Sequence, residues 1–439
     1  MLAKVYHSLK RFGQENAKIR TDLIWNLASF VVMAVCGLSI NIIIALLYSQ
    51  SALGLFNQSF AFHIILSQIA VAGLQFSALK HVAENNHLPS GSADCIKSAL
   101  LLGILLSTFV TLVFAMTIPF WAGILGSPEL HKSLTYLLPG IFLFPLNKIM
   151  LLSINGLQHM RAYAIFNAAR YFLICLCIML LSRISTLEEA STSLSLGLCI
   201  PEIILFFLFA LYLRRYLFNK FDFVNIWRWR LMHFKYIYKG AFNGILIEVN
   251  TRIDILMLGY FTNNATVGYY SFAATFAEGI KQITAIVKSN IDPLFSQFFS
   301  QQNELAVKAT ISKFRESIFP VILIVCILSI FAYPIGLRLL GIYSEYQSSI
   351  LIFTILMISI GVTSYYTVFS GVIIQSGRPG WQSILVLITA LLNILVCYFL
   401  IPPLGGLGAA IALAITFFTE AIFIAYWIKR LTEPKLKEL

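Results

Sequence analysis

Apolar stretches of roughly twenty residues recur about twelve times along this chain of 439 residues, and a helix of that length crosses the hydrocarbon core of a bilayer. Of all residues, 59% are hydrophobic and 11% are charged, and the mean hydropathy is +0.84. Such a composition leaves too little polar surface to keep a large particle soluble in water. We therefore expect an all-α polytopic membrane protein without a large soluble domain.

The apolar stretches divide the chain into two lobes of six helices each. The predicted spans are residues 23–47, 59–79, 98–120, 134–155, 162–181, 193–213, 240–261, 269–292, 318–337, 349–374, 382–400 and 408–427. The predicted organisation is a basic head (1–22), an N-terminal lobe (23–213), a connector (214–239), a C-terminal lobe (240–428) and a tail (429–439).

Positive charge falls almost wholly into alternate loops. With the N-terminus inside, the loops on that side carry 23 Lys and Arg residues, whereas the opposite loops carry only Lys132, Arg183 and Arg338. The positive-inside rule therefore predicts that both termini are cytoplasmic. The net charge of +12 is then a topology signal that favours anionic membrane lipids as partners, and it does not imply a nucleic-acid partner.

Two short segments recur at a spacing close to half the chain length. Residues 52–56 are echoed by residues 266–270 at an offset of 214, and residues 158–161 by residues 375–378 at an offset of 217. Because each half has an even number of helices, both halves enter the membrane from the same side. An axis along the membrane normal then relates two pseudo-symmetric six-helix bundles around a central cavity, which suits alternating access.

The connector between the lobes mixes aromatic and basic residues, as in Trp-Arg-Trp-Arg at residues 227–230. Between two spans on the cytoplasmic side, this mixture is typical of an interfacial helix among lipid headgroups. We expect the head (1–22) to form a shorter helix of the same kind.

Charged residues also occur within the predicted spans, where each costs roughly 2.5 to 3.5 kcal/mol on insertion scales and usually marks a paired interior or a water-filled path. The bases are Lys148, Arg170, Arg252, Lys281 and Lys288, and the main acids are Glu202, Glu248, Asp254 and Glu278. Two acid and base pairs are three or four residues apart and can be ion pairs that only hold helices together, namely Glu248 with Arg252 and Glu278 with Lys281.

Lys148 and Arg170 have no acid three or four residues away, so structural pairing explains them less well. Pro145 and Pro201, which lie near charged residues, each remove a backbone hydrogen bond. We therefore expect a cationic cavity with apolar walls. It would suit a ligand with an anionic head, such as phosphate or diphosphate, and an apolar tail.

The four acids are candidates for coupling transport to protons or sodium ions. Glu202 ranks first among them because no basic residue lies near it in the sequence. We expect no metal site and no cofactor, because the seven cysteines lack Cys-x-x-Cys spacing and the histidines are scattered. Short loops and the lack of a catalytic constellation argue against an enzyme.

Three stretches carry a resemblance to a known group of proteins: residues 53–56, residues 252–260 with 267–270, and residues 375–379 with 401–410. The chain resembles the polysaccharide repeat-unit flippases, which export O-antigen, capsule and exopolysaccharide units and belong to the multidrug, oligosaccharidyl-lipid and polysaccharide exporter superfamily. Glycines match the family pattern at Gly54, Gly268, Gly377 and Gly408, where we expect tight turns and close packing.

The resemblance implies a substrate of oligosaccharide linked through diphosphate to a polyprenol, moved from the inner to the outer leaflet of the bacterial inner membrane during the synthesis of lipopolysaccharide or a related glycan. A polysaccharide polymerase and a chain-length regulator are the implied partners. The alternative is a cation-coupled multidrug exporter, or an exporter of another lipid-linked precursor, of the same superfamily. The cavity residues diverge within the family, so the five cations rest on the depth argument alone.

Overall fold

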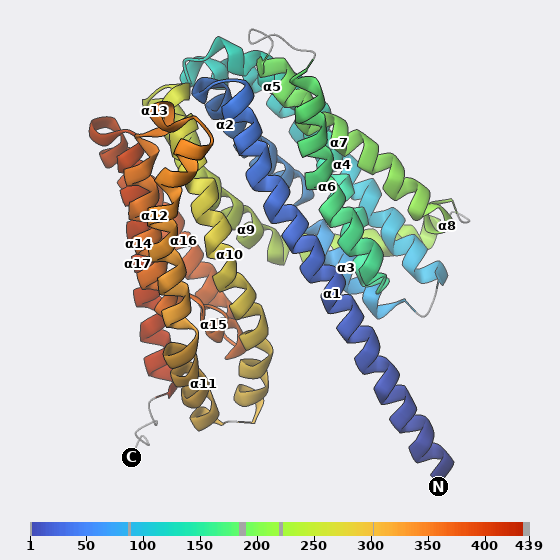
Figure 1. Ribbon diagram of the computed structural model, residues 1–439. Helices are drawn as coiled ribbons and strands as arrows, with labels where there is room; N and C mark the ends of the chain where they lie inside the picture. The colour runs from blue at the N-terminus through green and yellow to red at the C-terminus, as the bar shows by residue number, and fades with distance from the viewer. Residues whose placement is uncertain (1, 87–88, 184–189, 219–222, 302, 433–439) are drawn as a thin grey trace. The chain divides into compact units, whose positions relative to one another are not determined.

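The computed structural model describes residues 2–86, 89–183, 190–218, 223–301 and 303–432, and every regular element among them is a helix (Figure 1). The helices of the first half are α1 (Leu2–Leu47), α2 (Gln50–Val71), α3 (Leu74–Glu84), α4 (Pro89–Ile124), α5 (Pro128–Gly156), α6 (Met160–Leu181), α7 (Ala190–Tyr212) and α8 (Arg214–Leu217). Those of the second half are α9 (Phe223–Phe261), α10 (Asn264–Ser300), α11 (Glu304–Ser317), α12 (Phe319–Leu339), α13 (Tyr343–Tyr346), α14 (Ser349–Thr367), α15 (Val372–Gln375), α16 (Pro379–Leu404) and α17 (Gly406–Thr432). The prediction of an all-α membrane fold is confirmed.

Ten segments among the described residues are long and apolar enough to cross a membrane, which shows a multi-pass membrane protein. Twelve were predicted. The two that are missing from the ten correspond to α9 and α10, which have 39 and 37 residues and carry most of the charged side chains noted above. Their length suffices for a span, but charge lowers their hydropathy, so the count of twelve stays a prediction.

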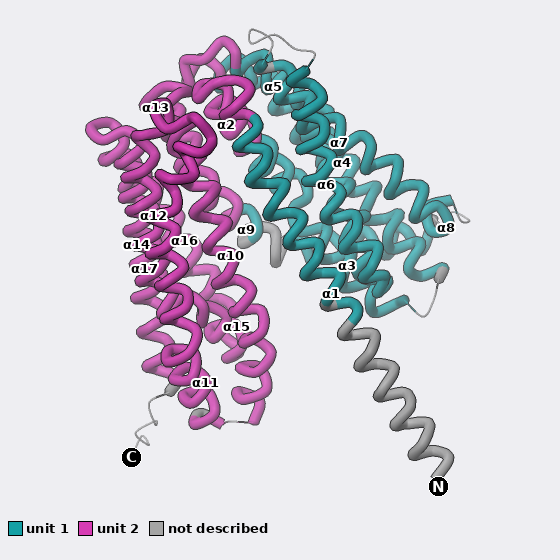
Figure 2. The backbone as a smooth tube through the Cα atoms, in the orientation of Figure 1, with its two compact units in different colours: residues 1–43, 62–121, 130–245 teal, residues 44–61, 122–129, 246–439 magenta. Residues whose placement is uncertain are grey.

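The chain forms two compact units (Figure 2). Unit 1 contains residues 1–43, 62–121 and 130–245, and unit 2 contains residues 44–61, 122–129 and 246–439. The units differ from the predicted lobes, because the end of α1 and the first half of α2 group with the C-terminal half of the chain. The division into two transport lobes stays a prediction.

The described part of the head continues into the first span without a break, because α1 is a single helix of 46 residues. The side chains of residues 1–20 lie outside the description. In the connector, residues 219–222 lie outside the described residues, α8 precedes them, and α9 runs from Phe223 through the predicted boundary at residue 240. Residues 433–439 of the predicted tail are likewise outside.

Unit 1 is built around apolar side chains of α3, α4, α5 and α7. Ile96, Met150, Ile154 and Phe209 are almost completely buried in one cluster. Burial of such side chains is the main source of close packing between helices whose outer faces meet lipid instead of water.

Unit 2 packs α14 against α10, α12 and α17. Aromatic rings fill its core: Tyr333 stacks on Phe353 with ring centres 4.1 Å apart, and Phe272 lies 4.7 Å from Tyr346. The asparagine Asn263 starts α10 by accepting a hydrogen bond from the Thr266 amide at 2.9 Å.

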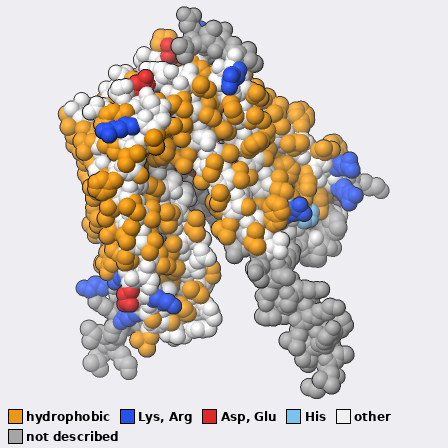
Figure 3. Space-filling model, viewed as in Figure 1, with side chains coloured by type: hydrophobic (Ala, Val, Ile, Leu, Met, Phe, Trp, Pro, Cys, Tyr) orange, Lys and Arg blue, Asp and Glu red, His pale blue; other side chains and the backbone are white. Residues whose placement is uncertain are grey.

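The outer faces of the spans are apolar, as Figure 3 shows for the visible side of the molecule. On α4, Leu105, Phe109, Leu112 and Met116 follow one another at helical spacing and are 60 to 84% exposed. A stripe of this kind would be unfavourable in water and is expected for a helix face that contacts lipid.

A reciprocal contact in unit 2 supports the internal repeat. A side-chain carbon added at Gly54 on α2 would overlap the carbonyl oxygen of Asn264, and one added at Gly268 on α10 would overlap that of Gln50. Both Gly268 and Asn264 lie 214 residues after Gly54 and Gln50, respectively. The two copies of the first repeated segment therefore pack on each other through their glycines.

The other two family-like glycines behave as expected. Gly377 has a φ of +79°, which favours glycine, in the turn before α16. Gly408 lies so close to the Leu400 carbonyl that a side chain would overlap it. The interpretation of these glycines as turns and close contacts is confirmed.

Candidate functional site

A buried polar cluster lies within unit 1, where three helices meet. The Arg170 Nε on α6 lies 2.9 Å from the Glu202 Oε1 on α7, and both side chains are less than 10% exposed. Asn147 on α5 donates one amide hydrogen bond to the Glu202 carboxylate and one to its backbone carbonyl, each at 2.8 Å. Its amide therefore satisfies a carbonyl close to the proline Pro201.

The ranking of Glu202 as the first candidate for ion coupling stays a prediction. It rested on distance along the sequence, whereas Arg170 reaches Glu202 from another helix. The pairing also explains how Arg170 is tolerated at this depth, because a buried charge needs a partner.

One aromatic ring connects the cations of this cluster. The Phe144 ring on α5 lies 4.5 Å from the Arg170 guanidinium carbon and 5.1 Å from the Lys148 Nζ. The His63 ring on α2 contacts the same phenyl group edge to face, at 4.9 Å between centres. The ring face attracts both cations without cancelling their charge.

Lys148 is held in place by α2. Its Nζ donates a hydrogen bond of 3.0 Å to the side-chain oxygen of Gln68, which is buried. The amide nitrogen of Gln68 in turn lies against Gly244 on α9, where any side chain would displace it.

A second set of charged residues lies in unit 2. The Arg252 guanidinium on α9 is 3.9 Å from the Glu278 carboxylate on α10 and 5.3 Å from the centre of the Phe60 ring. Glu248 lies one turn before Arg252 on α9 and is half-buried. At 3.9 Å, the Arg252 contact with Glu278 is at the outer limit for an ion pair and half-exposed, so it holds the helices weakly.

Among the acids of unit 2 whose side chains the structure describes, Asp254 is the most buried. It is 4% exposed, and one carboxylate oxygen accepts a hydrogen bond from the Tyr270 hydroxyl on α10. The other oxygen has no hydrogen-bond partner among the described residues. A neutral phenol thus holds this carboxylate, in contrast to the charged partner of Glu202.

The remaining candidates lie farther along α10. The Lys281 Nζ lies 3.8 Å from the centre of the Phe417 ring on α17, and Lys288 is half-buried. The Asp292 carboxylate touches Gly371 closely. These residues belong to unit 2, whereas the cluster around Arg170 belongs to unit 1.

Sequence reasoning missed the residues that position the charges in unit 1, namely His63, Gln68, Phe144 and Asn147. A usable signal was the polarity of α2, which has the lowest hydropathy of the ten candidate spans at 1.2. Its polar side chains Gln58, His63, Ser67 and Gln68 are all buried. Polar groups on a span must face protein or cavity, and this argument applies to neutral residues as well as to charges.

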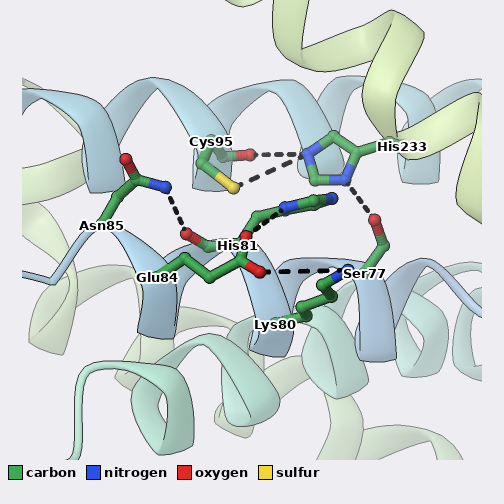
Figure 4. A network of polar contacts seen from close by, with 7 residues as sticks. All are labelled: Ser77, Lys80, His81, Glu84, Asn85, Cys95 and His233. Carbon is green, nitrogen blue, oxygen red and sulfur yellow. Dashed lines mark hydrogen bonds and ion pairs between the residues drawn. The ribbon is translucent and has the colours of Figure 1, made fainter.

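A third polar network fixes the start of α9 to unit 1, as Figure 4 shows. His233 is fully buried, accepts a hydrogen bond of 2.8 Å from Ser77 on α3 at Nδ1, and donates one of 3.2 Å from Nε2 to the Cys95 carbonyl on α4. Beside it, the His81 Nδ1 lies 2.9 Å from the Glu84 carboxylate. The connector is therefore docked on α3 and α4 through a specific histidine.

The fold is shared with several membrane transporters. A multidrug resistance MATE family transporter of the MOP superfamily, in an inward-facing conformation, aligns with a TM-score of 0.72 at 17% identity, covering 94% of this chain and 99% of that one. The lipid II flippase MurJ aligns at 0.69 and 16%, covering 93% and 87%. A MOP superfamily transporter from Pyrococcus furiosus aligns at 0.65 and 16%, covering 95% and 96%.

No curated protein matches the sequence closely enough to count as a relative. A family model, however, covers well over half of the chain: the polysaccharide biosynthesis protein family matches residues 19–299. The chain thus has the fold of the MOP superfamily transporters and belongs to the polysaccharide biosynthesis protein family.

Proposed function

We propose that this protein is a flippase for oligosaccharide repeat units linked through diphosphate to a polyprenol, which it moves from the inner to the outer leaflet of the bacterial inner membrane. Membership of the polysaccharide biosynthesis family supports the substrate class, and the transporter fold supports movement across the bilayer by alternating access. Both termini lie in the cytoplasm. The flipped unit then becomes the substrate of a polymerase that acts with a chain-length regulator.

The observation that carries the proposal is the pair of cations, Lys148 and Arg170, that lie over one ring, Phe144, within unit 1. Arg170 pairs with Glu202, and Lys148 donates a hydrogen bond to the Gln68 amide oxygen. Cations within membrane helices are costly, and they usually mark a paired interior or a path for a polar substrate. A diphosphate passing through the unit 1 cluster would be attracted by both cations.

Electrostatics favours export over import for such a substrate. The membrane potential, negative inside, drives an anion outward by about 2.3 kcal/mol per charge per 100 mV. The cations need only lower the cost of taking the diphosphate out of water.

If an ion is coupled to transport, Asp254 is now the first candidate, ahead of Glu248 and Glu278. Its carboxylate is buried, its partner Tyr270 is neutral, and one oxygen is open to a proton or cation. Glu202 is the least suitable, because Arg170 already balances its charge.

Complementation of a bacterial strain that lacks its repeat-unit flippase tests the proposal, with surface glycan as the readout. We expect the native chain to restore glycan, Lys148→Met to lower it at least about tenfold, as for the loss of one charge-assisted contact, and Lys148→Arg to recover part of it. Lys132→Met, which removes an exposed lysine before the same span, is the matched control.

Two results would count against the proposal. If Lys148→Met restored surface glycan fully, at a protein level in the membrane equal to that of the native chain, Lys148 would have only a packing role. Failure of the native chain to restore glycan, together with efflux of organic cations from cells that express it, would favour the multidrug alternative.

A further inference from the structure

Unit 2 contains an apolar groove that plays no part in the proposed function. It has a volume of 380 Å³ and lies between the first turn of α12, the last turns of α14 and the second half of α17. Its walls are formed mainly by Phe319, Tyr365, Tyr366, Phe418, Ile422 and Ala425. The volume is within the range of ligand sites, and the walls are almost wholly apolar.

A cation packs on two residues of the groove wall. The Arg315 guanidinium, in the last turn of α11, is 4.2 Å from the centre of the Tyr365 ring and 5.2 Å from that of Tyr366. Tyr365 also contacts Phe319 edge to face, at 5.0 Å between centres. Two residues that form the groove wall therefore also hold the arginine.

Arg315 has an incomplete set of hydrogen bonds. Its Nε is buried and has no hydrogen-bond partner among the residues that the structure describes. An arginine offers five donors in a planar fork, and a phosphate group accepts two of them at once. A buried donor left without a partner costs about 1 to 3 kcal/mol, so an anionic group at this place would be stabilising.

The position along the helices places this cation at the membrane surface. Arg315 lies just before the apolar run of α12, and Tyr365 and Tyr366 lie near the end of α14. Tyrosine and arginine at the end of a span are typical of the headgroup level. From there the groove continues along α17 past Ala425 and Ile422 to Phe418, two turns farther into the helix.

We propose that this groove is a binding site for an anionic phospholipid of the bilayer, with the phosphate on Arg315 and one acyl chain in the groove. The surrounding helices are membrane spans, so acyl chains are the apolar groups available to cover it. The same short helix carries Lys308, Lys313 and Arg315 against two acids, Glu304 and Glu316, and this net positive charge favours an anionic headgroup over a zwitterionic one.

The headgroup is tested by lipid binding to the purified full-length protein in detergent, measured by native mass spectrometry. The probes are phosphatidylglycerol and phosphatidylcholine with identical acyl chains. We expect tighter binding of phosphatidylglycerol, and an increase of its dissociation constant of about tenfold or more in Arg315→Gln. Arg338→Gln is the control, because Arg338 also lies over a tyrosine, Tyr343, but at the other end of α12.

The acyl chain is tested separately in vesicles of phosphatidylcholine that contain phosphatidylglycerol with a photoreactive group at the end of one chain. Labelled peptides are expected from residues 362–366 and 418–425, and Ala425→Phe, which fills the groove, should reduce this labelling severalfold.

Three results would refute the site. They are equal affinity for the two lipids, an equal loss of phosphatidylglycerol affinity in the Arg315 and Arg338 variants, and labelling spread over other spans. Displacement of the labelled lipid only by a polyprenyl phosphate, and not by unlabelled phosphatidylglycerol, would likewise overturn the assignment. None of these readouts depends on transport, so they test the lipid site independently of the proposed function.

Discussion

Arg170 and Glu202 form a buried ion pair of 2.9 Å between α6 and α7 of unit 1. The two residues are 32 positions apart, so the spacing of residues along a single helix does not indicate that they pair. Asn147 completes the arrangement from α5. Three helices of unit 1 are thus tied together at a point where an unpaired charge would be costly.

Removing one half of this pair should be more harmful than removing both. We expect Glu202→Gln to lower the free energy of unfolding by about 3 to 5 kcal/mol, because the Arg170 charge is left buried without compensation. The double variant Arg170→Gln with Glu202→Gln should recover part of the loss. Thermal unfolding of the purified protein in detergent measures both.

Glu129→Gln serves as the control for this experiment, since Glu129 is exposed. Equal stability of Glu202→Gln and the control would show that the pair contributes nothing. A double variant less stable than the single one would also contradict the argument.

The glycines of the repeated segment give a second prediction. In Gly54→Ala the new methyl group would overlap the Asn264 carbonyl oxygen, so α2 and α10 must move apart. Overpacking of this kind costs typically about 1 to 3 kcal/mol, and a carbonyl cannot rotate away as a side chain can. We expect a lower unfolding temperature and lower yield of folded protein.

Gly123→Ala is the matched substitution, because nothing lies within 4 Å of a side-chain carbon at Gly123 inside α4. It should be neutral or slightly stabilising, as alanine is the better helix former. Equal behaviour of the two variants would mean that the close approach at Gly54 is not needed for folding.

The histidine that docks the connector predicts a dependence of stability on pH. Burial, opposed by the hydrogen bond to the Cys95 carbonyl, lowers the pKa of His233 from 6.5 to about 4. Above pH 6.5 the residue is neutral in both states and its contacts are intact. Between pH 6.5 and about 4 the unfolded chain binds a proton that the folded protein does not, so stability falls, by at most about 3 kcal/mol.

Denaturant unfolding at several pH values between 7.5 and 4 measures this effect. His233→Gln should remove that part of the pH dependence, whereas His131→Gln, at an exposed position, should leave it unchanged. An identical pH profile in the native protein and in His233→Gln would show that the docking histidine does not titrate in this way.

The sequence determined the features that depend on the bilayer as a solvent. Long apolar helices, the absence of room for a large soluble domain, and the costly charges of α5, α6, α9 and α10 follow from composition along single segments. The family-like glycines were also visible, since only glycine allows the close contact at Gly54 and Gly268.

Only the tertiary structure decided how the charges are satisfied. Helix spacing reveals partners three or four residues apart, but Arg170 meets Glu202, Lys148 meets Gln68 and Asp254 meets Tyr270 across different helices. Such contacts depend on the relative rotation and depth of packed helices, which the hydrophobic pattern of each helix fixes only loosely. For that reason the sequence located the charges within the membrane helices, and the fold alone decided which side chains they contact.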